Sequence, residues 1–151
     1  MNTDNHGFKH GEITQRVIRI FYDVYNELGY GFLESVYERS LEIALNATNL
    51  KVCRQIEIPV QFRGQPVGIF AADMLVENCV LLELKAARAL DSSHTAQLLN
   101  YLRATDIEVG LLLNFGIKPE FKRLIFDNPR KAIRANPCLS VADLLTPDEP
   151  R

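Results

Sequence analysis

The chain has 151 residues, of which 47% are hydrophobic and 24% charged, and its formal net charge is −2. This size and composition predict one globular domain with a core of its own. The slightly acidic balance argues against a strongly basic, nonspecific nucleic-acid binder. No apolar run approaches the roughly 18 residues of a membrane span, and the polar N-terminus lacks the apolar stretch of a signal peptide. The three cysteines match neither a zinc spacing nor a disulfide framework, so we expect reduced thiols, a cytoplasmic location and no membrane partner.

Two amphipathic helices are predicted before residue 50. Residues 1–10 form a flexible leader in this prediction, and the folded domain extends over residues 11–127. From Glu12 to Leu28 apolar side chains recur every three or four residues, as on one face of a helix, and the glycines of the following GYG favour its end. The segment from Phe32 to Thr48 repeats this spacing, with an apolar face made of Leu33, Val36, Tyr37, Leu41 and Leu45.

Three strands are predicted next. Residues 51–62 alternate, which places Val52, Arg54, Ile56 and Ile58 on one face of the first strand. Residues 67–76 and 79–86 form the second and third strands, and their closeness in the sequence favours an antiparallel hairpin.

The last part of the predicted domain is a helix between strands. Residues 92–105 have helical spacing, with Ser92 or Ser93 as the N-cap. The near-continuous apolar run 108–115 predicts a central strand, joined by a right-handed crossover to a parallel neighbour. Residues 121–126 suit an edge strand. Residues 128–151 form a C-terminal extension of uncertain structure, in which 128–135 can form a short helix with Asn128 as its cap.

Basic side chains gather near the end of the predicted domain. From Gly116 to Asn136 there are six basic and two acidic residues. Such a stretch is either an ordinary solvated surface or a patch that faces phosphates. The candidate nucleic-acid contacts are Lys118, Lys122 and Arg123.

The segment AADMLVENCVLLELKA, residues 71–86, places three charged side chains in an apolar context. Residues two apart on a strand share a face, so Glu83 and Lys85 lie together, and a hairpin can bring Asp73 beside them. Two neighbouring carboxylates suit a hard divalent cation, and a lysine beside it can stabilise charge on a phosphate. The alternative is an ion pair between Glu83 and Lys85 within the sheet, with Asp73 capping a strand end.

Two helices add polar pairs to this candidate site. Gln97 and Tyr101 are four residues apart on the predicted helix 92–105 and so share a face. Glu34 and Tyr37 follow the glycine turn. A carboxylate at a helix start is also stabilised by the helix dipole, which explains Glu34 without any catalytic role.

Together these residues resemble a known family. GFLESVYERSL resembles the GxxExxY motif of a bacterial family within the PD-(D/E)XK nuclease superfamily, through Gly31, Glu34 and Tyr37. AAD followed by ELKA resembles the superfamily's split metal motif, with Ala72 in place of the proline. HTAQLLNYLRAT and VGLLLNFG resemble the family's next helix and strand. The resemblance extends from about Ile13 to Leu124.

The resemblance implies an α/β fold with a restriction-endonuclease-like core, a mixed β-sheet flanked by α-helices. It implies that Asp73, Glu83 and the backbone carbonyl of Leu84 hold Mg²⁺, for which Mn²⁺ is a possible substitute. Glu34 supplies a further carboxylate, as a ligand or through water. Lys85 orients water and stabilises the transition-state phosphate, supported by the remaining two catalytic candidates, Gln97 and Tyr101.

Two functions remain open from the sequence. The first is a Mg²⁺-dependent nuclease that hydrolyses phosphodiester bonds by in-line attack of water, on DNA rather than RNA, in repair, recombination or defence. The second is a noncatalytic nucleic-acid-binding or assembly module that retains the nuclease fold. In either case the small chain favours a homodimer or higher homo-oligomer, which builds a groove wide enough for a duplex.

Overall fold

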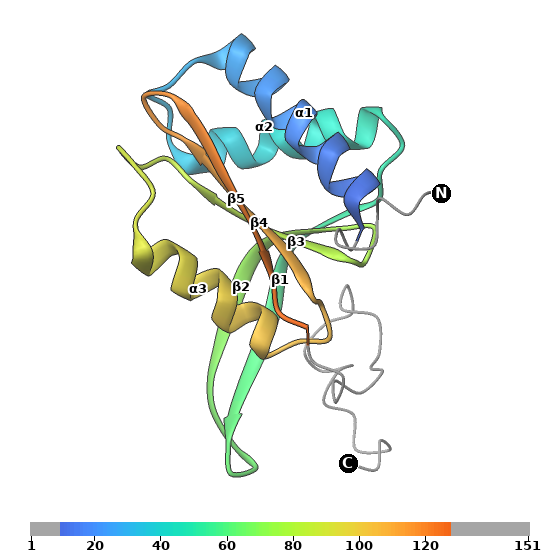
Figure 1. The fold of residues 1–151 in the computed structure, drawn as a ribbon, viewed down its shortest axis with the longest axis vertical. Coiled ribbons are helices and arrows are strands. Elements are labelled where there is room, and N and C mark those ends of the chain that lie inside the picture. Colours follow the sequence, from blue (N-terminus) through green and yellow to red (C-terminus); the bar gives the residue numbers. More distant parts are fainter. Residues whose placement is uncertain (1–9, 128–151) are drawn as a thin grey trace.

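The computed structural model describes residues 10–127 (Figure 1). The expectations for the leader before residue 10 and for the extension 128–151 therefore lie outside the described residues. The element order is α1 (Gly11–Leu28), α2 (Glu34–Ala47), β1 (Val52–Phe62), β2 (Gln65–Val76), β3 (Val80–Lys85), α3 (Ser92–Arg103), β4 (Val109–Phe115) and β5 (Pro119–Ile125). Every helix and strand predicted within these residues is present.

The sheet is mixed and has the strand order β1-β2-β3-β4-β5. Antiparallel hairpins join β1 to β2, β2 to β3, and β4 to β5, whereas β3 and β4 are parallel and connected through α3. This confirms the predicted hairpin, the crossover and the edge strand. The fold class is α/β, a five-stranded mixed sheet with three helices, as in restriction-endonuclease-like folds.

Helices cover the sheet from both sides and bury two apolar clusters. Helices α1 and α2 lie together, away from α3 (Figure 1). Val80, Leu82 and Leu84 of β3 pack with α1 and α2, whereas Leu81 packs with α3. Because side chains alternate along a strand, Glu83 and Lys85 belong to the α3 face of the sheet.

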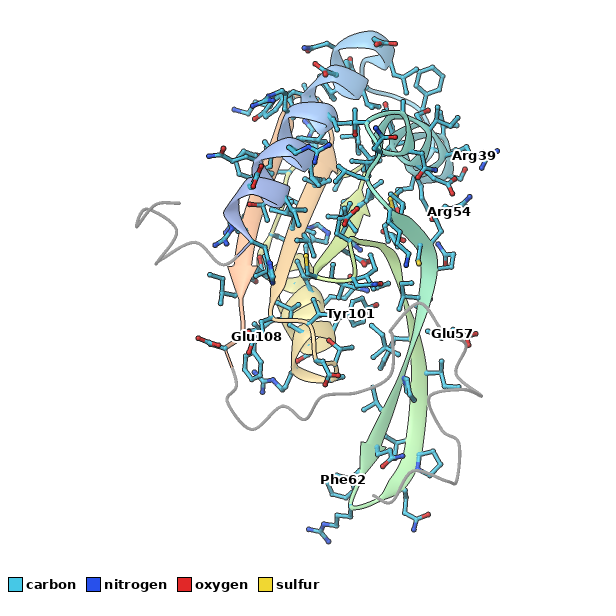
Figure 2. All side chains as sticks on the ribbon, turned by 90° about the vertical axis from the view of Figure 1, so that its right-hand side faces the viewer. Arg39, Arg54, Glu57, Phe62, Tyr101 and Glu108 are labelled. Carbon is cyan, nitrogen blue, oxygen red and sulfur yellow. The ribbon has the colours of Figure 1, made fainter. Side chains whose placement is uncertain are left out.

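The hairpin of β1 and β2 extends beyond the rest of the described molecule, with Phe62 near its tip (Figures 1 and 2). Four large apolar side chains on it are exposed: Phe62, Val67, Ile69 and Phe70. The predicted single apolar face of β1 is wrong. Val52 packs against the α1–α2 cluster, while Ile56 and Ile58 belong to the α3 cluster.

A tyrosine fixes the turn between α1 and α2. Gly29 ends α1 with a φ of 72°, and Gly31 has a φ of 112°, both in the region that favours glycine. The Tyr37 hydroxyl donates to the Gly29 carbonyl at 2.5 Å and accepts from the Phe32 N–H at 3.2 Å. Its fully buried ring stacks on Phe115. The turn that precedes Glu34 is therefore tied to the core.

The predicted apolar face of α2 is correct only beyond its first turn. Tyr37, Leu41 and Leu45 are buried, but Leu33 is 75% exposed, and Val36 in the first turn is exposed as well. Leu33 is the N-cap residue of this helix, and α2 begins only at Glu34. The first apolar side chain of the pattern therefore belongs to the turn and not to the packed face.

The start of α3 corrects a prediction. The N-cap is Asp91 and neither Ser92 nor Ser93. Asp91 accepts hydrogen bonds from the backbone N–H groups of Ser93 and His94, and His94 Nδ1 accepts from the Asp91 N–H in return. A carboxylate is as good an N-cap as serine, so composition alone does not choose between neighbours.

Two further expectations concern membranes and cysteines. Across residues 10–127, no helix combines the length and apolar character needed to cross a membrane. Cys79 is free, but Cys53 is disulfide-bonded, so the expectation of reduced thiols throughout is wrong for Cys53.

Candidate metal and active site

Asp73 lies where β2 separates from β3. The two strands pair only from Met74 to Val76 with Leu82 to Val80. Beyond that point the Leu84 N–H donates to Asp73 Oδ2 at 2.7 Å, so a side-chain carboxylate replaces a backbone acceptor. This bond holds Asp73 beside the strand that carries Glu83 and Lys85, as the hairpin prediction required.

Glu83 is a buried acid with an unsatisfied oxygen. Only 5% of the residue is exposed, and its Oε1 atom is buried without a hydrogen-bond partner among residues 10–127. Lys85 forms an ion pair with the other oxygen, its Nζ lying 3.8 Å from Glu83 Oε2. Burying a carboxylate oxygen without a partner is costly, so this atom is a natural ligand position for a cation.

The electrostatics of the pair show how far Lys85 offsets the two carboxylates. Burial raises the pKa of Asp73 to about 6, and burial together with the Asp73 charge raises the pKa of Glu83 to about 8. The Lys85 charge lowers the pKa of Glu83, because an opposite charge favours the ionised form, but burial and Asp73 outweigh it. The lysine therefore compensates the two carboxylates only in part. An all-oxygen pair that needs positive charge fits a hard divalent ion.

Lys85 is linked to α3 through a chain of hydrogen bonds. Its Nζ donates to Gln97 Oε1 at 2.9 Å, and Gln97 Nε2 donates to the Tyr101 hydroxyl oxygen at 3.0 Å. Burial and the Glu83 charge raise the pKa of Tyr101, which keeps its hydroxyl protonated. Three of the predicted residues thus form one connected unit that orients the Lys85 ammonium.

Glu34 is exposed at the first position of α2, next to the turn fixed by Tyr37. Its charge contributes to the raised pKa of both Asp73 and Glu83, so it acts on them through space. Within residues 10–127, however, no group of three or more His, Cys, Asp or Glu side chains is placed to hold a metal ion. Asp73 and Glu83 are a pair, and Glu34 is not grouped with them.

The three basic candidates do not form one surface. Lys118 is exposed in the turn before β5. Lys122 is opposite Leu112 of the α3 cluster, whereas Arg123 is opposite Leu111 of the α1–α2 cluster. Arg123 also lines a hollow of about 620 Å³ with residues of α1, and burial lowers its pKa. Neighbours on a strand point to opposite faces, so Lys122 and Arg123 are on different sides of the sheet.

Two polar residues near the site were missed by the sequence analysis. Glu38 is a buried acid of α2, and Gln55 is the residue of β1 that lies across from Asp73; they are joined by a hydrogen bond of 2.8 Å. The signal for Glu38 was its position four residues after Glu34, which places both on one helix face. No sequence signal marked Gln55.

The fold and these side chains define an α/β protein with two carboxylates and a lysine at a strand separation in a mixed sheet. A family model described as the PD-(D/E)XK nuclease superfamily matches residues 11–124, and the chain belongs to that superfamily. Its members are generally hydrolytic nucleases that act on nucleic acid with divalent metal ions. The match does not distinguish the GxxExxY family within it.

Comparison with solved structures supports the fold alone. A structure titled "Crystal structure of SSO0001" aligns with a TM-score of 0.50 at 18% identity, covering 62% of this chain and 50% of that chain. The chain therefore spans half the length of that protein. No curated protein matches this chain.

Proposed function

We propose that the protein is a Mg²⁺-dependent nuclease that hydrolyses phosphodiester bonds of DNA. One observation carries the proposal: Glu83 is buried beside Asp73 with an unpartnered oxygen, and Lys85 compensates their charge only in part. DNA repair, recombination or defence against foreign DNA is the setting we assign to such an activity.

Asp73, Glu83 and the backbone carbonyl of Leu84 would hold the ion, and Mn²⁺ would substitute for Mg²⁺. When bound, the ion acts as a Lewis acid that stabilises negative charge on the phosphate. Glu34 extends the acidic environment from the start of α2. It is proposed to contact the ion directly or through water.

Lys85 is the residue proposed to contact the reacting phosphate. Its ammonium is held by Gln97, which is itself held by Tyr101, so its position does not depend on the 3.8 Å contact with Glu83. A preorganised ammonium stabilises the charge that develops on the transferred phosphate and orients the attacking water. Three basic residues are proposed to contact the phosphate backbone separately and not as one patch: Lys118, Lys122 and Arg123. Lys122 and Arg123 lie on different sides of the sheet.

Titration with Mn²⁺ tests the proposed site without a known substrate. Wild-type protein is expected to bind Mn²⁺ saturably at up to millimolar concentration. The substitution Asp73→Asn should abolish binding, whereas Asp23→Asn, the same chemical change on the exposed face of α1, should leave it unchanged. Binding that survives in Asp73→Asn would refute the site.

A cleavage assay then tests the chemistry. Single- and double-stranded DNA and RNA are incubated with wild type and Lys85→Ala in Mg²⁺. We expect cleavage of DNA by wild type and a loss of about 100-fold or more in Lys85→Ala, because an electrostatic stabiliser of the transition state is removed. Equal rates for the two proteins would contradict the role of Lys85.

The alternative is a noncatalytic nucleic-acid-binding or assembly module with the same fold. It is favoured by the low exposure of the Glu83 and Lys85 side chains, 6% and 18%, and by the lack of a third grouped acid in residues 10–127. A folded wild type that binds no Mn²⁺, with or without DNA, would support this alternative.

A further inference from the structure

The strand pair β1–β2 changes faces beside Asp73. The pairing runs from Arg54 with Met74 to Ile56 with Ala72, which leaves Gln55 across from Asp73. On β2, Met74 packs with the α1–α2 cluster but Ala72 with the α3 cluster, two faces for residues that normally share one. On β1, Val52 packs with the α1–α2 cluster but Ile56 with the α3 cluster, so this strand changes faces at the same level. Asp73 therefore lies at a local bend of both strands.

Gln55 has an unusual backbone conformation at that bend. Its φ is 53°, in the left-handed region that non-glycine residues adopt at a cost of about 1–2 kcal/mol. Glutamine lacks the short side chain with which asparagine or aspartate stabilises this conformation. Something outside the backbone must therefore hold Gln55 in place.

Glu38 supplies that hold from α2. Its Oε2 atom accepts from Gln55 Nε2 at 2.8 Å and from Arg54 Nε at 3.2 Å. Glu38 is buried whereas Arg54 and Gln55 are exposed, so both bonds are partly shielded from water. Arg54 also donates a hydrogen bond to Glu42 at 3.2 Å. Figure 2 shows Arg54 on the part of β1 near Arg39 of α2, away from the hairpin tip.

We propose that Glu38 is a positioning residue that, through Gln55, holds the bend which aims the Asp73 carboxylate at the Leu84 N–H. Glu38 does not touch the reacting atoms in this proposal. Helix α2 thus contributes Glu34 to the acidic environment and, one turn later, the anchor for the strand that carries Asp73. The inference deepens the proposed function, since the positioned carboxylate is the proposed metal ligand.

Three variants separate positioning from general stability. Glu38→Ala removes the anchor. Gln55→Ala removes the anchored side chain but keeps the Cβ atom that makes the positive φ unfavourable, a cost that glycine would relieve. Gln55 is exposed, so this variant should remain folded. Glu42→Ala is the matched control, because it deletes a second carboxylate bound to Arg54 but leaves Gln55 and Glu38 joined.

Hydrogen exchange of the Leu84 amide, followed by NMR, reports the Asp73 bond directly. We expect exchange at least about 10-fold faster in Glu38→Ala and Gln55→Ala than in wild type, and unchanged exchange in Glu42→Ala, since local protection depends on the bond that is lost. Equal protection of Leu84 in Glu38→Ala and Glu42→Ala would overturn the inference. So would full protection in Gln55→Ala.

The Mn²⁺ dissociation constant is measured on the same proteins. Loss of a supporting residue typically weakens metal binding about 10- to 100-fold, and we expect this in Glu38→Ala and Gln55→Ala only. If wild type binds no Mn²⁺ but the exchange pattern holds, the proposed function fails and the positioning role stands. If wild type binds Mn²⁺ and all three variants match it, the positioning role fails and the proposed function stands.

Discussion

Glu83 and Asp73 show how burial changes the chemistry of single side chains. Both are carboxylates at a strand separation, and the protein places neither in a complete ion pair. Lys85 donates a hydrogen bond to Gln97 at 2.9 Å, and its contact with Glu83 is longer, 3.8 Å. The folded protein therefore carries two acids that are more easily ionised in the unfolded chain, a local cost that a bound cation would remove.

The raised pKa values predict an unusual pH dependence of stability. The folded-state pKa values of Asp73 and Glu83, about 6 and about 8, lie above the ordinary values of 3.8 and 4.5 for these side chains. Between about pH 4 and pH 8 the folded protein therefore binds more protons than the unfolded chain. The free energy of unfolding falls as the pH rises through this range. Thermal unfolding in EDTA should give a higher Tm at pH 5 than at pH 8.

The double variant Asp73→Asn, Glu83→Gln is the control for this effect. Neither amide titrates, so this decline in Tm from pH 5 to pH 8 should largely disappear. Adding Mn²⁺ to wild type at pH 8 should raise the Tm, because the ion binds the ionised folded form. A wild-type Tm that rises with pH across this range, or an unchanged slope in the double variant, would contradict the assignment.

At the scale of elements, the segment after β3 is fixed by the strand beside it. Asn114 of β4 is fully buried and makes two hydrogen bonds to Ala87, accepting its N–H at 2.8 Å and donating to its carbonyl at 2.9 Å. Glu120 of β5 accepts from the Leu90 N–H at 3.2 Å. These bonds hold the link between Lys85 and α3, and so the spacing between Lys85 and Gln97.

Gly116 is required for this close approach. A Cβ atom at Gly116 would lie 2.2 Å from the Ala87 carbonyl oxygen, a backbone atom that cannot move aside. We expect Gly116→Ala to lower the free energy of unfolding by about 1–3 kcal/mol, the usual cost of overpacking. Urea unfolding measures this directly.

Gly68→Ala serves as the comparison for Gly116→Ala. Nothing lies within 4 Å of a Cβ added at Gly68, which is on the extended hairpin. Its effect should stay within about 0.5 kcal/mol, as for other exposed positions. Equal effects of the two substitutions would show that the Ala87 backbone can yield.

At the scale of the whole molecule, α1 and α2 cover one face of the sheet and α3 covers the other. The β1–β2 hairpin extends past both helical layers (Figure 1). The hairpin exposes four large apolar side chains. The candidate site lies within the body, at the separation of β2 from β3.

We predict that the protein is a homo-oligomer, most simply a homodimer, since two copies would build a wider groove. The chain mass is 17.1 kDa, so light scattering after size exclusion should give about twice that value or a higher multiple. A mass of one chain at tens of micromolar protein would refute the prediction. The Asp23→Asn variant should have the same mass as wild type, because its change is confined to an exposed position of α1.

The sequence by itself determined the elements, their order and the candidate pair of acids. Helical and strand periods are local properties of the backbone, so α1, α3, the β2–β3 hairpin and the crossover from β3 through α3 to β4 were predicted from spacing. The candidate site residues could be recognised because a charged side chain in an apolar strand is costly unless it is paired or bound. These residues are Asp73, Glu83 and Lys85. The order and spacing of the motifs indicated the superfamily to which the chain belongs.

Only the tertiary structure decided how these parts meet. The period of a strand cannot show a change of face at Gln55, because the bend is held by Glu38 from a different element. Nor can the period show on which side of the sheet Lys122 and Arg123 lie until the neighbouring strand sets the register. Contacts between distant segments determine burial, and burial turns two ordinary carboxylates into a pair with raised pKa values.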